Sequence, residues 1–409
     1  MIPNTHPSTL VFKKGSYILV EDKEDPHFFI IQEGKVQLSR KDEVVKERDG
    51  HVFGPGEFFG VVAAMSNHSH IETARAITDV TLTAIPASQF DAFIQNNTLA
   101  AMHIMAQFSN RMRYLTKGLT QLTLNDSAEE DRPEDLFAVG RFYEESGNLS
   151  HAHYAYGRYL AYCPQGEHAR DAGERMAAFT PHGKAVPYTI AGNKKIYAAD
   201  TVLYAQGEPA EELYVIQSGS VKITKIVNNS EILLAILKAG DFVGEMAILE
   251  SKPRSVTAVT YEECALLAVS KETFPQVAAS NPQIISRLIR TLADKIWFLY
   301  RHLANTDLID PVARMYDALF IQIEKNRIPV ESTGDYTFSF SLKELVSMTG
   351  MNDIEVEKAV EKIESDPDIE LTDDKIHIRS VAAITKQRNY YKSIEWRKKA
   401  FRISHPDMY

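Results

Sequence analysis

Four residues in the second half of the chain have the types and spacing needed to bind an anion. Gly244 and Glu245 are followed, after one short segment, by Arg254 and Ser255. Glycine allows the backbone to turn closely past a bound group, and arginine carries a fixed charge on a planar fork that suits a phosphate. Glutamate adds a hydrogen-bond acceptor, and serine adds a hydroxyl. Together they predict a site for an anion.

A strand, a turn and a short helix must position these four residues. The segment around Phe242 favours a strand, and the residues after Gly244 favour a short helix. The first backbone N–H groups of such a helix have no partner within the helix, and the helix dipole favours negative charge there. We therefore expect the backbone at Met246, Ala247 and Ile248 to contribute to the anion site.

Residues 242–258 resemble the phosphate-binding cassette of the cyclic-nucleotide-binding domain family, which the catabolite activator protein and protein kinase A regulatory subunits share. The resemblance implies that the ligand is cAMP or cGMP, and no further cofactor is expected. It also implies that Arg254 and Ser255 bind the phosphate, while Glu245 accepts the ribose 2′-hydroxyl and orients Arg254. The alternative is a domain that keeps only the fold, in which Glu245 and Arg254 form an ordinary ion pair.

The cassette has an earlier counterpart that lacks its polar residues. The segment that begins at Phe28 recurs from Leu213, which reveals an internal repeat. In the first copy, the positions of Glu245, Arg254 and Ser255 are occupied by Val61, His70 and Ile71. Because valine and isoleucine have no polar side-chain atoms, we expect the first copy to be a scaffold or docking domain, or to bind something other than an ordinary cyclic mononucleotide.

The repeat predicts an α+β multidomain fold. Each copy has short strands separated by Gly, Pro and Asp turns, which favours a jelly-roll β-barrel, and each ends in a long helix, expected at residues 99–122 and 283–303. On the second helix, Trp297 and Tyr300 are candidates for a lid over the base of the ligand, although the helix seam also needs aromatic residues. The two helices could pair within one chain or across a homodimer.

The segment between the two copies predicts a helical hairpin insert. Residues 135–164 resemble one tetratricopeptide repeat through Gly140, Tyr143, Gly147, Ala152, Tyr156, Tyr159 and Pro164. Small residues let two helices approach, and proline ends the second helix. One such unit cannot bury its own faces, so we expect it to pack on the β-barrels or on another protein. The His-x-His pairs at residues 68–70 and 151–153 lack a third ligand, so no metal site is predicted.

Residues 310–378 resemble the helix-turn-helix and wing that regulators of the catabolite-activator type carry after their ligand domain. The helix that would enter a DNA groove is expected at residues 352–364. Residues 352–366 carry six acidic residues, two lysines and no arginine, so nucleic-acid binding is disfavoured. A basic and aromatic tail follows. It could bind nucleic acid or an acidic membrane surface, or it could dock onto the acidic domain beside it.

Five segments are therefore expected. They are a degenerate cyclic-nucleotide-binding-like domain (8–125), the tetratricopeptide-like segment (130–182), a cyclic-nucleotide-binding domain (186–304), the winged-helix-like domain (306–384) and the basic aromatic tail (385–409).

Composition narrows the class of protein. The chain of 409 residues has 45 Lys and Arg against 55 Asp and Glu, and its net charge of −10 argues against general coating of nucleic acid. Its two cysteines, Cys163 and Cys264, cannot form a disulfide framework, which favours a reducing compartment. No segment reaches the roughly 18 apolar residues of a membrane span. We therefore expect a cytoplasmic protein.

Three functions remain open. The first is a non-enzymatic receptor for cAMP or cGMP that relays binding to a protein partner or within a homodimer. The second is a ligand-controlled DNA-binding transcription factor, and the third is a scaffold without a nucleotide ligand. An enzyme is not expected, because the sequence has no P-loop, His-Glu-x-x-His motif, nucleophile elbow or kinase signature.

Overall fold

The chain forms two compact units, each built from non-contiguous segments. The computed structural model describes residues 7–40, 52–124, 131–178, 188–192, 194–227, 230–338, 340–349, 351, 353–373 and 375–404. One unit combines Ile85–Arg113 with Ala128–Ala293, and the other combines Ser8–Ala84, Tyr114–Ser127 and Asp294–Tyr409. Each unit therefore contains parts of both copies of the repeat.

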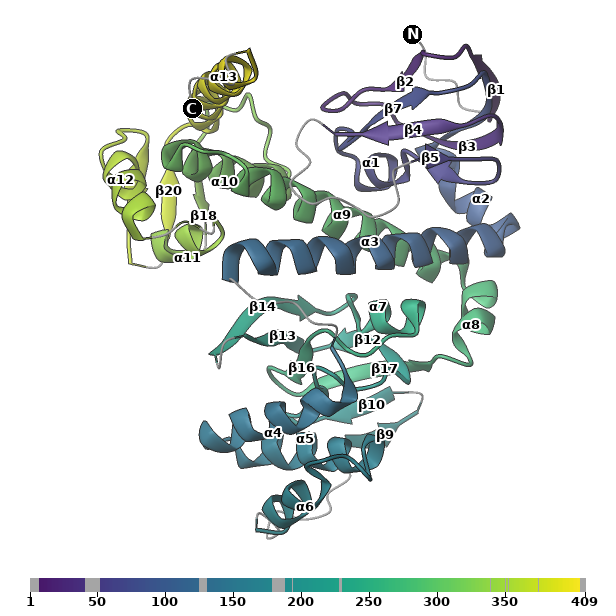
Figure 1. Cartoon of the computed structure of the whole chain (residues 1–409), viewed down its shortest axis with the longest axis vertical. Coiled ribbons are helices and arrows are strands. Elements are labelled where there is room, and N and C mark those ends of the chain that lie inside the picture. Colours follow the sequence, from purple (N-terminus) through teal and green to yellow (C-terminus); the bar gives the residue numbers. More distant parts are fainter. Residues whose placement is uncertain are drawn as a thin grey trace. The chain divides into compact units, whose positions relative to one another are not determined.

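Among the described residues, the first copy forms two antiparallel sheets, with the strand orders β1-β8-β3-β6 and β2-β7-β4-β5 (Figure 1). The strands are β1 (Ser8–Phe12), β2 (Tyr17–Leu19), β3 (His27–Glu33), β4 (Val36–Ser39), β5 (Val52–Phe53), β6 (Phe58–Phe59), β7 (Thr73–Ala76) and β8 (Val80–Pro86). In β4, Val36 and Leu38 are buried while Gln37 and Ser39 are exposed, so one face of the strand enters the core. We call this copy, with its short helix α1 (Val61–Ser66), the first β domain.

The second copy also forms two antiparallel sheets in the described residues, with the orders β15-β12-β17-β10-β9 and β11-β16-β13-β14. The strands are β9 (Tyr188–Ala191), β10 (Lys194–Tyr197), β11 (Val202–Tyr204), β12 (Glu212–Ser218), β13 (Ser220–Val227), β14 (Ser230–Lys238), β15 (Phe242–Val243), β16 (Thr257–Thr260) and β17 (Cys264–Ser270). With the short helix α7 (Glu245–Glu250) they form the second β domain. The mixed α+β class with antiparallel sheets is confirmed, whereas closure into jelly-roll barrels stays a prediction.

One tight turn recurs in both β domains. Gly34 and Gly219 have φ angles of +87° and +81°, a left-handed conformation that glycine adopts without steric penalty. A side chain at either position would overlap a backbone carbonyl, that of Asp79 in the first domain and that of Glu263 in the second. The repeated glycine is thus required for the same steric reason in both copies.

A pair of helices follows each β domain. They are α2 (Phe90–Asn96) and α3 (Thr98–Leu124) after the first, and α8 (Phe274–Ser280) and α9 (Pro282–Thr306) after the second. The two long helices agree with the predicted ranges to within three residues at each end. Leu288, Leu292 and Ile296 of α9 are fully buried, which explains the apolar spacing in the sequence.

Three helices form the insert between the β domains: α4 (Leu136–Glu145), α5 (Leu149–Tyr162) and α6 (Ala169–Ala178). Gly140 of α4 lets α5 approach, since a side chain there would come within 2.6 Å of the Tyr156 ring. The insert packs on the second β domain through hydrogen bonds from the Tyr143 hydroxyl to Glu231 and from the Tyr154 hydroxyl to the Leu203 carbonyl. Its likeness to a tetratricopeptide repeat stays a prediction.

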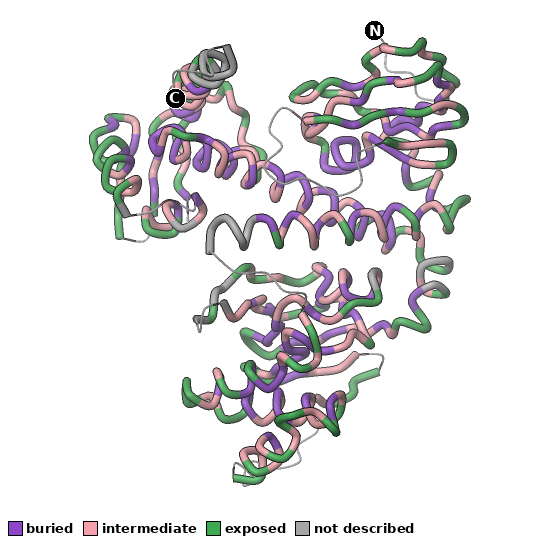
Figure 2. The backbone as a smooth tube through the Cα atoms, in the orientation of Figure 1, coloured by how far each residue is buried: buried purple, intermediate pink, exposed green. Residues whose placement is uncertain are grey.

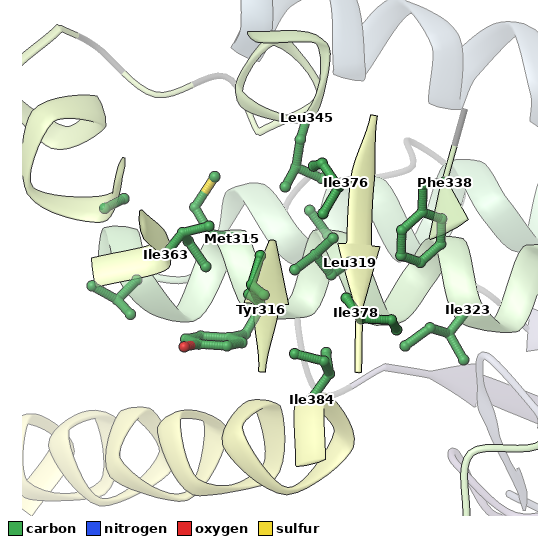
Figure 3. Close-up of a cluster of buried hydrophobic side chains, with 14 of the residues drawn as sticks. Met315, Tyr316, Leu319, Ile323, Phe338, Leu345, Ile363, Ile376, Ile378 and Ile384 are labelled. Atoms are coloured by element: carbon green, nitrogen blue, oxygen red, sulfur yellow. The ribbon is translucent and has the colours of Figure 1, made fainter. Parts of the chain in front are cut away.

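The C-terminal segment has its own core. It contains α10 (Pro311–Lys325), β18 (Tyr336–Phe338), α11 (Leu342–Ser347), α12 (Asp353–Glu364), β19 (Ile369–Leu371), β20 (Ile376–Ile378) and α13 (Val381–Ser404), with the sheet order β18-β20-β19. Helix α10 is buried along most of its length (Figure 2). Its side chains meet those of the sheet and the start of α13, including Leu319, Ile376, Ile378 and Ile384 (Figure 3).

The basic residues near the C-terminus belong to a packed helix where they are described. Helix α13 begins at Val381, inside the core of the C-terminal segment, so residue 385 does not start a separate element. Arg388 donates to Asp317 at 2.9 Å and lies 4.2 Å above the Phe320 ring. The buried Glu395 accepts the backbone N–H of Asp310 at 2.8 Å. This favours docking onto the neighbouring acidic domain over a free tail.

No helix within the described residues has the combination of length and hydrophobicity that crossing a membrane requires.

Candidate functional site

The predicted glycine turn lies between β15 and α7. Gly244 has a φ angle of +80°, and a side chain there would overlap the guanidinium of Arg254 and come within 3.0 Å of the Tyr204 ring. The glycine is therefore required here by neighbouring side chains, while its close approach to a bound group stays a prediction. Its neighbours are the cassette's own arginine and a tyrosine of β11.

Arg254 points into the second β domain, and only 4% of its surface is exposed. Its Nη1 donates to the Gly244 carbonyl at 2.6 Å, and its Nη2 donates to the Glu212 carbonyl. The guanidinium carbon lies 4.0 Å from the centre of the Tyr204 ring, which is a cation–π distance. Among the described residues, Nε of Arg254 has no hydrogen-bond partner although it is buried.

The backbone fixes Arg254 in the same way that it fixes His70 in the first β domain. The Arg254 N–H donates to the Glu208 carbonyl at 2.8 Å, and its carbonyl accepts from the Gly207 N–H at 2.8 Å. In the first domain, His70 makes the matching pair of bonds with Lys23 and Asp22, at 2.9 and 2.8 Å. The structure therefore confirms that His70 stands where Arg254 stands.

The other predicted ligand residues occupy different surroundings. Glu245 begins α7 and is 4% exposed, while Ser255 is half-buried. Burial raises the pKa of the Tyr204 hydroxyl, and the Glu245 charge adds to this increase while Arg254 opposes it. Ala247 and Ile248 are buried, and a role for their backbone in ligand binding stays a prediction. Gly244 and Arg254 thus lie against the Tyr204 ring, and the Glu245 charge acts on its hydroxyl.

Helix α3, which follows the first β domain, contacts the cassette of the second. The Ser109 hydroxyl donates to the Met246 carbonyl at 3.1 Å, and Nη2 of Arg113 donates to the Pro253 carbonyl at 3.2 Å. Met246 lies in α7, and Pro253 immediately precedes Arg254. Neither α3 residue could be predicted from the sequence, because no local pattern shows that these distant segments meet.

The two predicted lid residues lie against the first β domain. Nε1 of Trp297 donates to the Ser69 carbonyl at 2.9 Å, and its ring stacks on His68 with 4.0 Å between centres. The guanidinium of Arg40 lies 4.1 Å from the centre of the Tyr300 ring. Both side chains thus contact residues of the first copy, and their role as a lid over the second cassette stays a prediction. Each long helix therefore contacts the β domain of the other copy.

The stack of His68 on Trp297 should weaken in acid. Burial lowers the pKa of His68 to about 4, and the charges of Arg327 and Arg301 act in the same direction. An unfolded histidine has a pKa of about 6.5, so between about 6.5 and 4 the unfolded chain binds a proton that the folded domain excludes. We expect stability to fall as the pH drops through this range. Thermal melting that follows Trp297 fluorescence in a Trp396→Phe chain checks this.

A His68→Phe variant keeps an aromatic ring but cannot titrate, which makes it the control. Its melting temperature should fall less than that of the parent between pH 6.5 and 4. Equal pH dependence in the two chains would contradict the role of His68.

The first β domain lacks the chemistry of the second at the matching positions. Val61 is buried in α1, and Ile71 is half-buried. His70 is 4% exposed, its Nε2 has no hydrogen-bond partner among the described residues, and burial lowers its pKa. The position of Arg254 is therefore filled here by a histidine whose charged form is disfavoured by burial.

The sequence pattern of the cyclic nucleotide-binding domain matches the chain twice, at residues 9–97 and 194–281. The CRP-like cAMP-activated global transcriptional regulator of Mycobacterium tuberculosis is 27% identical over 159 residues, which are 39% of this chain and 71% of that protein. The cAMP-activated global transcriptional regulator CRP of Salmonella typhimurium is 31% identical over 125 residues, 30% of this chain and 60% of that protein.

A solved structure of the c-di-GMP responsive global regulator CLP of Xanthomonas campestris is 23% identical, with a TM-score of 0.36. The match covers 45% of this chain and 92% of that one.

Proposed function

We propose that this chain, which carries two cyclic nucleotide-binding domains, is a non-enzymatic receptor that binds a cyclic nucleotide of the cAMP type in its second β domain. The observation that carries the proposal is the state of Arg254. The side chain is buried and fixed by two carbonyls, yet one of its donors has no partner among the described residues. A buried arginine donor without a partner is unfavourable until an acceptor arrives.

The residues around Arg254 fit a cyclic nucleotide. A phosphate would accept hydrogen bonds from the guanidinium and from the first backbone N–H groups of α7, while the Ser255 hydroxyl would add a contact. Glu245 would accept the ribose 2′-hydroxyl. Nη1 and Nη2 of Arg254 already donate to the Gly244 and Glu212 carbonyls. A ligand that moves Arg254 would therefore also move the segments that contain Gly244 and Glu212. The names of the relatives favour cAMP, and cGMP stays the second candidate.

Relay to a partner is the next part of the proposal. A ligand shifts a conformational equilibrium only by its difference in affinity for the two states. Helix α3 donates hydrogen bonds to the carbonyls of Met246 and Pro253, so movement of the cassette would change the contacts of α3. We propose that the helices and the winged-helix-like C-terminal segment pass this change to a protein partner or a second copy of the chain. The first β domain would act as a scaffold. Cys163 and Cys264 are free and buried, which fits a location in a reducing cytoplasm.

Thermal melting of the whole chain with cAMP, cGMP and cyclic dinucleotides tests the proposal. A ligand at 100 times its Kd stabilises the folded state by about 2.7 kcal/mol, which gives a clear rise in melting temperature. We expect this rise with cAMP and none with AMP, which has no cyclic phosphate. No rise with any cyclic nucleotide would instead favour the scaffold without a ligand.

A ligand-controlled transcription factor is the second candidate, because the relatives' names describe transcriptional regulators. The exposed residues of α12 oppose it, since several are acidic: Ile354, Glu357, Lys358, Glu361, Lys362 and Glu364. A duplex-DNA shift that appears with cAMP and weakens with salt would support DNA binding.

A further inference from the structure

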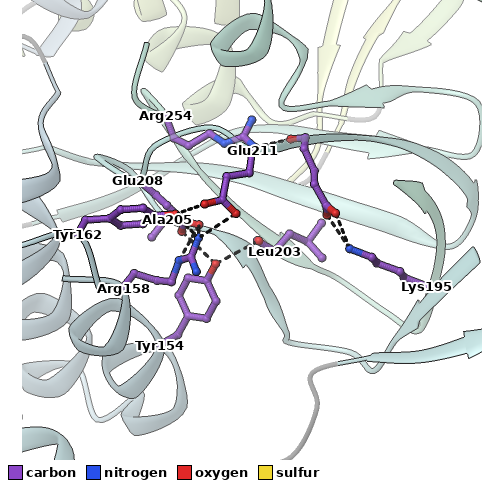
Figure 4. Close-up of polar contacts among 10 residues, drawn as sticks. Tyr154, Arg158, Tyr162, Lys195, Leu203, Ala205, Glu208, Glu211 and Arg254 are labelled. Atoms are coloured by element: carbon purple, nitrogen blue, oxygen red, sulfur yellow. Dashed lines mark hydrogen bonds and ion pairs between the residues drawn. The ribbon is translucent and has the colours of Figure 1, made fainter. Parts of the chain in front are cut away.

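Helix α5 of the insert holds the loop that carries the backbone partners of Arg254. The Tyr154 hydroxyl donates to the Leu203 carbonyl at 3.2 Å and to the Glu208 carboxylate at 3.0 Å. Arg158 approaches the same carboxylate with Nε at 2.8 Å and Nη2 at 2.6 Å (Figure 4). Two residues of the insert therefore contact Glu208, and the carbonyl of Glu208 accepts the Arg254 N–H.

Glu208 is an unusual residue for the interior of a β domain. It is only 4% exposed, and burial raises its pKa while Arg158 opposes that increase. Its remaining described partner is the Ala205 N–H, at 3.1 Å within its own loop. A buried carboxylate that loses its positive partner is strongly destabilised and seeks another. Arg158 is the positive side chain that now holds it.

Arg254 is a second positive residue bonded to the loop that carries this carboxylate. Its backbone is bonded to Glu208 and to the neighbouring Gly207, and the charges of Glu208 and Arg254 both act on the hydroxyls of Tyr154 and Tyr204. The Nε of Arg254 is the donor without a described partner. If Arg158 were absent, the Glu208 carboxylate would compete with a phosphate for Arg254.

We propose that Arg158 and Tyr154 are positioning residues for the nucleotide site: by holding the Glu208 carboxylate, they leave the guanidinium of Arg254 available to the phosphate. This inference rests on the proposed function of the second β domain. It also gives the insert a regulatory role, because a partner that pulled α5 from the loop would release Glu208 toward Arg254 and weaken nucleotide binding.

The first β domain allows a comparison at the positions of Arg254 and Glu208. Its counterpart of Arg254 is His70, and the residue that accepts the His70 N–H is Lys23. The position of Glu208 is thus a lysine where the arginine is replaced by histidine, while the charges of Asp25 and Glu72 act on that histidine.

The test uses the whole chain and calorimetric titration with cAMP. We expect Arg158→Met to weaken binding at least about tenfold, because the freed carboxylate occupies Arg254. Adding Glu208→Gln to that variant should restore affinity to within about threefold of the parent, since the competing charge is gone. Loss of helix packing alone would not be rescued in this way.

The matched control is Arg141→Met, which breaks an exposed ion pair with Glu145 on the same insert and should leave affinity unchanged. Should Arg158→Met fail to fold, Arg158→Lys keeps the charge without the planar fork and should show a smaller loss. Parent-like binding by Arg158→Met, or no rescue in the double variant, overturns this inference and leaves the receptor intact. Absence of binding by the parent chain overturns the proposed function itself.

Discussion

Replacing Arg254 with leucine is expected to weaken cAMP binding by about 100-fold or more. A hydrogen bond to a charged group contributes about 1.5–3 kcal/mol, and about 1.4 kcal/mol corresponds to a factor of ten in affinity. Two such bonds to the phosphate therefore account for a loss of this size. Calorimetric titration of the whole chain measures it directly. The chain should also melt at a lower temperature, because the Gly244 and Glu212 carbonyls lose their donors.

His70→Leu is the matched control for this loss. His70 occupies the same backbone position in the first β domain and is equally buried, so its replacement perturbs a similar site without removing a guanidinium. We expect parent-like affinity for cAMP in this variant. Retained micromolar binding in the Arg254→Leu chain would show that the ligand, if any, is held elsewhere.

The second large effect is expected from Gly244→Ala. Alanine at a φ angle of +80° costs about 1–2 kcal/mol, and its methyl group would overlap the guanidinium of Arg254. Because Arg254 is buried against the Tyr204 ring, it has little room to yield. Both a lower melting temperature and at least a tenfold loss of cAMP affinity should follow, as measured by thermal melting and calorimetry.

The equivalent glycine of the first β domain separates backbone strain from overlap with the arginine as causes of that loss. Gly60 has a φ angle of +77°, but a side chain there would meet the Leu19 methyl at 3.2 Å and the His27 carbonyl at 3.3 Å, with no arginine nearby. Gly60→Ala should therefore show the backbone strain and keep cAMP affinity. Equal affinities in the two alanine variants would contradict the role given to Gly244.

Local patterns in the sequence predicted much of the architecture. The glycine before α7, the long apolar repeat of α9 and the recurring strand segments are each set by short-range geometry, and the structure has them within a few residues. The polar centre of the cassette was predictable for the same reason, since Gly244, Glu245 and Arg254 lie in one short segment.

Contacts between distant segments could not be predicted in this way. Tyr204, Glu208 and Arg158 became visible only when β11, its following loop and α5 were placed together. The basic residues near the C-terminus could bind an external acid or the acidic domain beside them, and only the packed structure shows that Asp317 on α10 binds Arg388. In each case, the charge or aromatic character of the residue was evident from the sequence, whereas the identity of its contact partner depended on tertiary packing.

Each long helix contacts the β domain of the other copy, and this has a practical consequence for the design of fragments of this protein. Ser109 of α3 bonds to the second β domain, and Trp297 of α9 bonds to the first, so each repeat depends on a contact from the other. A fragment that ends after α3 would lack Trp297, and a fragment that starts at the second β domain would lack Ser109. Truncated halves expressed separately should therefore be poor substitutes for the parent, whereas co-expressed halves could complement each other.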